Sequence, residues 1–274
     1  IAYALPAYKV PESSRTSRGV LMQALLPIAP TEAIATVLPV AKFSQERFLL
    51  LLTKHGWIKK TPLLAFERIT ARGLIAVSLG EGDFLVRASL CGESDSVLLC
   101  STRGLATRFE ASAEQLRASG RQSRGVKSMR MGDGDAIADM FVVVGADADA
   151  EAANQQYLVA VTRCGFGKVV ALANFRTQRR GGKGLIAMKF KRKDDRLLAL
   201  TPHSGDGDEE LLLITQKGTI VRQRLSAISE QGRATTGVKL QKLDEDDLVA
   251  SVKVVPATED DDEEEDEGSL PTGE

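Results

Sequence analysis

The sequence has 274 residues, of which 43% are hydrophobic and 5% aromatic, and its formal net charge is −1. This length suits one large all-β domain or two ordinary domains, and the low aromatic content argues against a stacking platform for single-stranded bases. Apolar runs of about five residues, such as 48–52, are too short to span a membrane. Because the sequence begins at Ile1 and not at Met, we expect it to be a fragment.

Few residues offer catalytic or metal-binding chemistry. The three cysteines are an odd number without CxxC spacing, which indicates free thiols in a reducing cytosol. The two histidines, His55 and His203, are far apart in the sequence and lie beside expected turns, and no His/Cys cluster has the spacing of metal ligands. We therefore expect no catalytic residue, metal or cofactor in this chain.

The small net charge hides an uneven distribution. Residues 259–274 contain ten acidic residues and no basic one, so the remaining chain has 27 acidic and 36 basic residues, a net charge of +9. A basic body favours a polyanionic partner. The acidic segment cannot bury apolar surface, so we expect a folded domain at 1–258 and a disordered tail at 259–274. The tail either keeps the chain soluble or competes with the polyanion.

In chain order, two sequence elements alternate with a period of about 50 residues. The first is a basic-Gly-apolar element, whose glycines are Gly19, Gly73, Gly125, Gly184 and Gly237. The second is an apolar run that ends in a glycine turn, whose glycines are Gly56, Gly104, Gly165 and Gly218. A weaker third echo is an acidic residue before a short apolar strand, as in "EAIATVLPV" at 32–40, "GDFLVRASL" and "DAIADMFVV".

Each period predicts about four strands. The apolar runs are short and end at glycine, which favours strands buried on both faces, and the Thr-x-x-Gly sequence suits a hairpin whose glycine has a positive φ. Only 111–120 looks helical, for two turns. Four strands in 40 to 50 residues are typical of a propeller blade. The alternative, a two-sheet sandwich, would not require the period.

Basic residues accompany both series of glycines. Those around the first series are Arg15, Arg18, Arg68, Arg72, Arg121, Arg124, Lys127, Arg179, Arg180, Lys183, Arg233 and Lys239. Those after the second series are Lys59, Lys60, Arg108, Lys168, Arg222 and Arg224. A single arginine is more often a solvated surface residue. Because the repeats place equivalent loops on one edge of the ring, however, the periodic set predicts a curved positive track around the rim.

The segment "TQRRGGKG" at 177–184 concentrates cations and glycines most strongly. It could cradle a nucleotide phosphate, hold a nucleic-acid backbone, or be a solvated turn. A phosphate-binding P-loop needs Gly, four residues and then Gly-Lys-Ser/Thr before a helix. Here Lys183 is followed by Gly184, and no helix is expected to follow, which argues against nucleotide binding.

The heptapeptide "QRRGGKG" is identical to the seven-residue box of the C-terminal domain of the DNA gyrase A protein. The chain resembles that family over nearly its whole length, through its repeats with degenerate copies of the box, its "TxxG" turns and its acidic tail. The box residues carried over directly are Gln178, Arg179, Arg180, Gly181, Gly182, Lys183 and Gly184.

The resemblance implies an all-β, six-bladed propeller-like disc, the β-pinwheel, whose blades exchange strands with their neighbours. It also implies a non-catalytic domain that bends duplex DNA around its rim with positive handedness. In that family the full box usually lies in the first blade, whereas here it is the fourth of five equivalents. Residues 178–184 are then either the latch that completes the wrap or one rim contact among several.

The resemblance further implies partners and a setting. The expected partners are double-stranded DNA, bound largely without regard to sequence, and the rest of gyrase A with gyrase B in a complex that holds two copies of each. ATP and Mg²⁺ would bind elsewhere in that ATP-dependent type II topoisomerase, in the bacterial cytoplasm or an organelle of bacterial descent. Two alternatives stay open: the C-terminal domain of topoisomerase IV, which usually has degraded boxes, and a protein-binding propeller, whose binding would tolerate salt.

Overall fold

The fold was analysed in a computed structural model that describes residues 1–14, 17–29, 32–145, 156–203, 205 and 209–257. Arg15 and the acidic tail at 259–274, for which the sequence makes predictions, lie outside the described residues. Among the described residues, no helix is long and apolar enough to cross a membrane.

The described residues form four antiparallel sheets. The first has the order β3 (Leu85–Cys91), β1 (Phe48–Thr53), β2 (Trp57–Pro62), β6 (Val126–Lys127). The second has the order β7 (Ile137–Val143), β4 (Ser96–Ser101), β5 (Leu105–Glu110), β10 (Leu185–Ile186). The third has the order β11 (Leu197–His203), β8 (Tyr157–Thr162), β9 (Phe166–Ala171), β14 (Val238–Lys239). The fourth has the order β15 (Val249–Pro256), β12 (Glu209–Thr215), β13 (Ile220–Arg224).

Each sheet is built around a hairpin made by an apolar run and the strand after its glycine. Gly56, Gly104, Gly165 and Gly218 have φ between +76° and +88°, as the Thr-x-x-Gly pattern predicts. Alternate residues of the apolar strands pack on opposite sides: Leu99 belongs to the core between the first and second sheets, and Leu98 to the core between the second and third. The prediction of strands buried on both faces is therefore confirmed.

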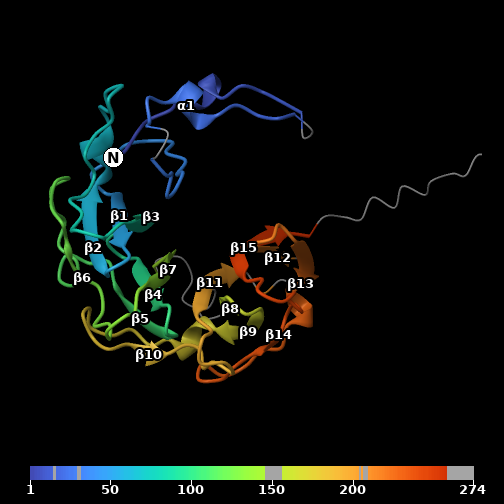
Figure 1. Cartoon of the computed structure of the whole chain (residues 1–274). Coiled ribbons are helices and arrows are strands. Elements are labelled where there is room, and N and C mark those ends of the chain that lie inside the picture. Colours follow the sequence, from blue (N-terminus) through green and yellow to red (C-terminus); the bar gives the residue numbers. More distant parts are fainter. Residues whose placement is uncertain (15–16, 30–31, 146–155, 204, 206–208, 258–274) are drawn as a thin grey trace, which may run out of the picture.

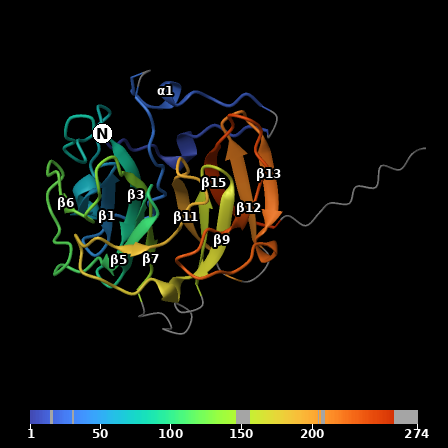
Figure 2. The same cartoon turned by 60° about the horizontal axis from the view of Figure 1, so that its bottom comes forward.

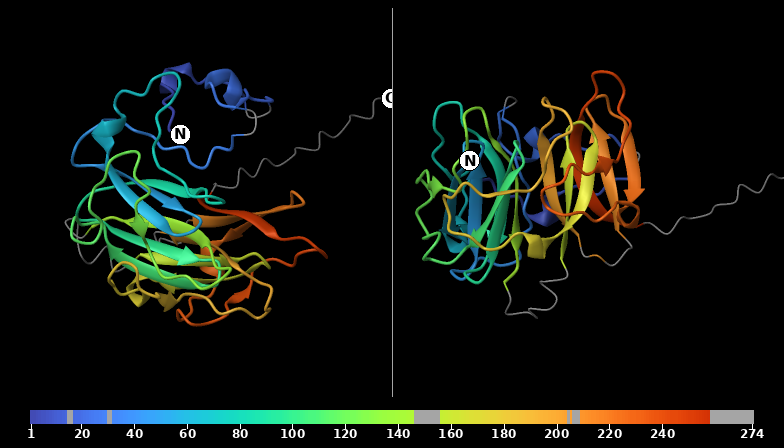
Figure 3. Two further views of the ribbon diagram at one scale, coloured as in Figure 1. Left: turned by 60° about the vertical axis from the view of Figure 1, so that its left-hand side comes forward. Right: turned by 90° about the horizontal axis from the view of Figure 1, so that it is seen from below.

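The outer strand of a sheet comes from further along the chain. β6 pairs with β2, β10 with β5, and β14 with β9, and each of these short strands follows the glycine of a basic-Gly element. Figure 1 shows β6, β10 and β14 on the outside of an arc of sheets, with β3, β7, β11 and β15 toward its centre. The turned views show the sheets side by side with their strands along the axis of the arc (Figures 2 and 3). This is the all-β, propeller-like architecture that the repeats predict, with the exchanged strands that the family resemblance implies.

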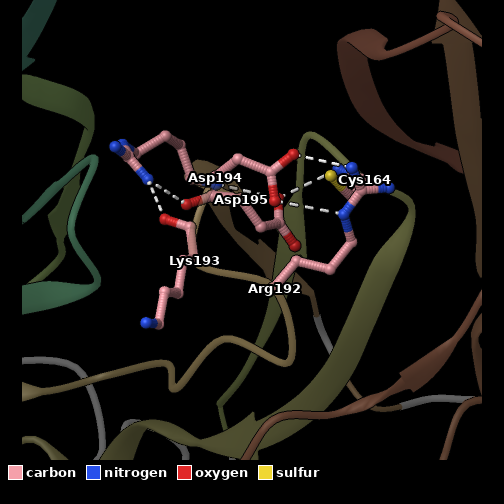
Figure 4. Close-up of polar contacts among 6 residues, drawn as sticks. Cys164, Arg192, Lys193, Asp194 and Asp195 are labelled. Atoms are coloured by element: carbon pink, nitrogen blue, oxygen red, sulfur yellow. Dashed lines mark hydrogen bonds and ion pairs between the residues drawn. The ribbon is translucent and has the colours of Figure 1, made fainter.

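The acidic residue before each of these strands has a structural role that the sequence pattern does not reveal. Asp83, Asp135, Asp195 and Asp247 each accept a hydrogen bond, at 3.0 to 3.2 Å, from a main-chain N–H in the hairpin turn of the same sheet. Figure 4 shows Asp195 directed toward the turn at Cys164, beside the Arg192–Asp194 ion pair. The repeated acid thus fixes the turn against the innermost strand.

Two predictions about local structure are wrong. Residues 111–120 make no helix: after one turn, in which the Leu116 N–H bonds the Ser112 carbonyl at 2.8 Å, the chain pairs with β2 through the Ser119 N–H and the Lys60 carbonyl at 2.8 Å. This pairing and the burial of Leu116 outweigh the helical propensity. The acid-led segment 32–40 forms no strand in its described residues.

Short helical segments occur at other places. Three 3₁₀ turns follow the second strand of a hairpin, namely η2 (Leu63–Phe66), η3 (Leu172–Asn174) and η4 (Leu225–Ala227). The N-terminal segment contains η1 (Ala7–Lys9) and α1 (Met22–Leu25). It contacts the first sheet's repeat through the Ala2–Leu74 bridge.

Candidate nucleic-acid interface

The box loop, residues 177–184, lies on the outer edge of the second sheet, immediately before β10 (Figure 1). The Gln178 N–H donates to the Arg108 carbonyl at 2.7 Å, and the Gly181 N–H to the Ser128 carbonyl at 2.8 Å. The φ of Gly184 is +77°, and a Cβ there would lie 2.6 Å from the Ala106 carbonyl oxygen. Only glycine therefore fits, because any side chain would collide with the backbone of β5.

The cations of the box loop play different roles. Arg180 is half-buried, and its guanidinium donates to the carbonyls of Gln115 at 2.6 Å and Lys127 at 2.7 Å. The side chains of Arg179 and Lys183 are exposed and make no hydrogen bond or ion pair with the described part of the chain. Arg180 therefore holds the loop in place, while Arg179 and Lys183 are available to an external anion.

Residues 120–125 and 232–237, called here the sister loops, have the same construction as the box loop. In the three loops the carbonyls of Ser123, Gly182 and Thr235 accept a main-chain N–H at 2.8 to 3.3 Å from the preceding repeat. Arg233 donates to the Ile186 carbonyl at 2.6 Å, as Arg180 does to Lys127. Equivalent loops therefore recur on the outer edges of successive sheets.

Lys59 and Lys168 do not lie on an exposed rim, which corrects that prediction. Both side chains are buried, at 1% and 0% exposure. Their ammonium groups donate to main-chain carbonyls at 120–123 and 232–235 respectively, at 2.6 to 3.3 Å. Burial lowers the pKa of each to about 8. These lysines tie the sister loops to the sheets.

Lys60 is also fully buried, so its predicted exposure is wrong as well. Its ammonium group pairs with Glu93 at 2.8 Å and donates to the Ala111 carbonyl. The physical reason is the alternation of a strand: consecutive residues of β2 point to opposite faces of the sheet, and both faces are covered here. A basic residue on such a strand is buried with internal partners.

The other predicted cations keep some or all of their exposure. The exposed ones are Arg18, Arg68, Arg72, Arg124, Lys127, Arg222, Arg224 and Lys239, and the half-buried ones are Arg108, Arg121 and Arg233. Arg222 forms an ion pair with Glu210, which reduces its availability. Burial lowers the pKa of Arg108, which donates to the Ser96 hydroxyl at 3.0 Å.

Arg124 and Lys127 share one aromatic support. Their cationic groups lie 4.1 and 4.4 Å from the centre of the Trp57 ring, within the range of cation–π attraction. Lys127 also donates to the His55 carbonyl at 3.0 Å. Trp57 therefore preorganises two cations, Arg124 in a sister loop and Lys127 beside the box loop, a contact that the sequence pattern does not reveal.

Arg130 is a rim residue that sequence reasoning missed. It is exposed, and its main-chain N–H donates to the Gly182 carbonyl at 2.8 Å. It lines a shallow hollow together with Lys127 and Gly181. The available signal was the spacing, because Arg130 and Lys189 both stand five residues after a repeat glycine. The described residues thus offer, along the outer edges of neighbouring sheets, exposed cations and glycine-lined backbone suited to phosphate groups.

The chain matches the family described as "DNA gyrase C-terminal domain, beta-propeller" over residues 2–41, 47–91, 95–143, 156–204 and 209–256. It is 43% identical to the DNA gyrase A protein of Synechocystis sp. over 93% of this chain and 32% of the relative. It is 34% identical to the chloroplastic/mitochondrial DNA gyrase A protein of Arabidopsis thaliana over 98% of this chain and 30% of the relative. The chain thus spans about a third of the length of these relatives.

Two solved structures have the same fold. The C-terminal domain of DNA topoisomerase IV has a TM-score of 0.77 and 22% identity, covering 87% of this chain and 71% of the other. The DNA gyrase A C-terminal domain has a TM-score of 0.72 and 24% identity, covering 92% and 78%. At these identities the likeness establishes the fold alone.

Proposed function

Because the chain belongs to the DNA gyrase C-terminal domain family, we propose that it binds duplex DNA along its outer rim and bends it with positive handedness. The observation that carries the proposal is the recurrence of the box loop and the sister loops on the outer edges of successive sheets. The box loop presents the exposed Arg179 and Lys183. The sister loop at 120–125 presents Arg124, and the exposed Lys239 follows the sister loop at 232–237. A curved series of such loops can follow a bent phosphate backbone.

Energetics favour a distributed interface. Bending 20 to 30 base pairs by 40 to 90° costs on the order of 1 to 6 kcal/mol, and a longer wrap costs more. Phosphate contacts from the two free cations of the box loop, Arg179 and Lys183, are too few to offset the free energy of bending. Contacts from several loops along an arc can offset it together. Phosphates are alike in every sequence, so the binding should depend little on base sequence.

We further propose the setting of this domain. It acts within a gyrase A protein, in a complex with gyrase B and DNA, and presents the bent segment to an ATP-dependent type II topoisomerase that introduces negative supercoils. ATP and Mg²⁺ bind to other parts of that enzyme. The relatives include a chloroplastic/mitochondrial protein, which supports a bacterial cytoplasm or an organelle of bacterial descent as its location.

A linking-number experiment tests the proposed wrapping. The chain is bound to relaxed closed-circular DNA, a nicking-closing enzyme relaxes the complex, and the linking number is read after the protein is removed. The test variant is Arg179→Ala/Lys183→Ala, since both side chains are free of internal contacts with the described residues. The matched control is Lys42→Ala/Lys253→Ala, which removes the same charge from exposed positions outside the loops.

We expect a positive shift for the wild type and the control, and a smaller one for the test variant. If the test variant retains the full linking-number shift, the other loops and not the box loop are responsible for the wrapping. Absence of any shift, with salt-tolerant binding to a protein instead, would support a protein-binding propeller and refute the proposal.

A further inference from the structure

The sister loops each enclose one positive charge. The Lys59 ammonium lies 2.8, 2.6 and 3.3 Å from the carbonyl oxygens of Gly120, Arg121 and Ser123. The Lys168 ammonium lies 2.9, 2.6 and 3.3 Å from the equivalent oxygens at 232, 233 and 235. The matching distances show that this loop conformation turns three main-chain oxygens toward a single cation.

The box loop has the same carbonyls but a different residue beneath them. The strands that carry these residues have one register: Leu51 faces Lys59, Leu99 faces Thr107, and Ala160 faces Lys168. The residue before each pairs with the outer strand in the same way, as Ile58 with Val126, Ala106 with Leu185, and Gly167 with Val238. Thr107 therefore stands where the two lysines stand, and its side chain leaves the strand on the same face.

The Thr107 hydroxyl is buried without a partner. The residue is 1% exposed, and its Oγ1 has no hydrogen bond among the described residues. The carbonyls of Arg179 and Arg180, which correspond to the oxygens bound by the lysines, likewise accept no hydrogen bond within the described part of the chain. A buried polar group without a partner costs about 1–3 kcal/mol, so the Thr107 hydroxyl, at the position from which the lysines reach the sister loops, points to a ligand.

A second unpartnered atom lies in the same loop. Gln178 Nε2 is buried and has no partner among the described residues. The equivalent residue in one sister loop, Ser119, directs its hydroxyl to Ser123 at 2.8 Å, which is inside the loop. A rotation of the Gln178 amide would present its oxygen, since the two ends of an amide are nearly isosteric.

We infer that the box loop binds a monovalent cation of the size of K⁺, held by the carbonyl oxygens of Arg179, Arg180 and Gly182 and by the Thr107 hydroxyl. The chemistry of the oxygens selects the charge. They are all neutral, and residues 177–184 include no acid, whereas Ca²⁺ and Mg²⁺ are bound through carboxylates. Rings of main-chain carbonyls are typical K⁺ ligands.

The neighbouring arginines do not exclude such an ion. Lys59 and Lys168 hold their charges in loops that carry Arg121 and Arg233, so this loop conformation accommodates a cation beside a guanidinium. In the box loop the Arg180 guanidinium turns away toward Gln115 and Lys127. A bound ion would fix the carbonyls of Arg179 and Arg180 and, if the proposed function holds, orient the Arg179 side chain toward phosphate.

The test measures the whole chain in the absence of DNA, so it does not depend on the proposed function. Thermal unfolding is recorded in 100 mM KCl, NaCl, LiCl or choline chloride at equal ionic strength. We expect the Tm to rise by about 2–5 °C from choline to K⁺, as a ligand bound only by the folded state requires. Thr107→Val removes one ligand at nearly constant volume, and Thr107→Lys restores the residue of the sister loops.

Both variants should lose the difference between K⁺ and choline, and Thr107→Lys should reach the K⁺-bound Tm in every salt. Crystals of the wild type soaked in Tl⁺ should show an anomalous peak at coordinating distance from Thr107 Oγ1. Equal Tm values in the four salts, or a K⁺ effect that persists in Thr107→Val, would overturn the inference. A wild-type crystal without that peak would assign the buried oxygens to ordered water instead.

Discussion

Each of the buried lysines Lys59 and Lys168 satisfies several main-chain carbonyls with one side chain. Carbonyls in a loop on the edge of a sheet have no neighbouring strand to bond them, so a buried donor is needed wherever water cannot reach. The exposed side chains of Arg179 and Lys183 make no such hydrogen bonds to the described residues. Two basic residues a few positions from a glycine can therefore differ completely in their effects on stability and binding.

We predict that Lys168→Met destabilises the chain by about 1–3 kcal/mol, because the substitution keeps the buried stem and leaves the loop carbonyls without their donor. Lys183→Met removes the same charge from an exposed position and should change stability by less than about 0.5 kcal/mol. Urea unfolding of the two variants beside the wild type measures the difference. Equal stabilities would mean that water replaces the ammonium group at no cost.

Sequence alone could identify these lysines as members of the repeat but not their direction. The period of the glycines places Lys59, Thr107 and Lys168 at equivalent positions, yet the exposure of a basic side chain there depends on whether the next repeat's loop covers the strand. The loop that covers the strand lies about 60 positions further along the chain, as the hydrogen bond from Lys59 to the Arg121 carbonyl shows. A local sequence pattern cannot predict such a long-range contact. The box itself was predictable, because its cations and glycines are contiguous.

At the scale of the element, the repeated hairpin and the short outer strand determine the architecture. The alternation of the two glycine series predicted both, and the positive φ of Gly56 and Gly125 agrees with it. The wrong prediction is the two-turn helix at 111–120, where helix-forming residues make a single turn. There the pairing of Ser119 with β2 depends on tertiary structure, which overrides local propensity.

Gly184 and Gly218 allow the two reasons for glycine at these turns to be separated: the positive φ and the lack of space for a side chain. Gly184 and Gly218 both have positive φ, at +77° and +88°, but only Gly184 lies against backbone, while an added Cβ at Gly218 would meet nothing within 4 Å. We predict that Gly218→Ala costs about 1 kcal/mol, the conformational strain alone. Gly184→Ala should cost clearly more, because the outer strand β10 must move away from β5.

Chemical denaturation of both glycine variants gives the comparison. Hydrogen exchange at the Ala187 amide, which bonds the Gly104 carbonyl at 2.8 Å just beyond β10, reports whether the outer strand has loosened. A similar loss of stability in the two variants would show that the close approach to the Ala106 carbonyl is relieved by small shifts.

At the scale of the whole molecule, charge is arranged by sheet position. Exposed cations such as Arg124 and Lys183 lie beside the outer strands, whereas the central strands β1, β4 and β8 are wholly or almost wholly buried. The distribution, and not the net charge of −1, is therefore the relevant quantity for a polyanionic partner.

We predict a steep salt dependence for binding to duplex DNA of random sequence. About seven to eleven rim cations that each neutralise one phosphate give a slope of log K against log[salt] of about −6 to −10. Arg179→Ala/Lys183→Ala should make the slope less steep by about 2, and Lys42→Ala/Lys253→Ala should leave it unchanged. Fluorescence anisotropy between 50 and 300 mM KCl measures all three proteins. A slope near zero would exclude a phosphate-based interface.

The late arrival of each outer strand also bears on how the chain is made. β1, β2 and β3 are complete by residue 91, but their sheet closes only when β6 emerges at residue 126, and the same delay recurs at β10 and β14. A nascent polypeptide leaving the ribosome therefore always has one unfinished sheet, whose edge awaits the following repeat. During synthesis each hairpin is therefore made before its outer strand, and a pause in translation would leave β2, β5 or β9 temporarily uncovered.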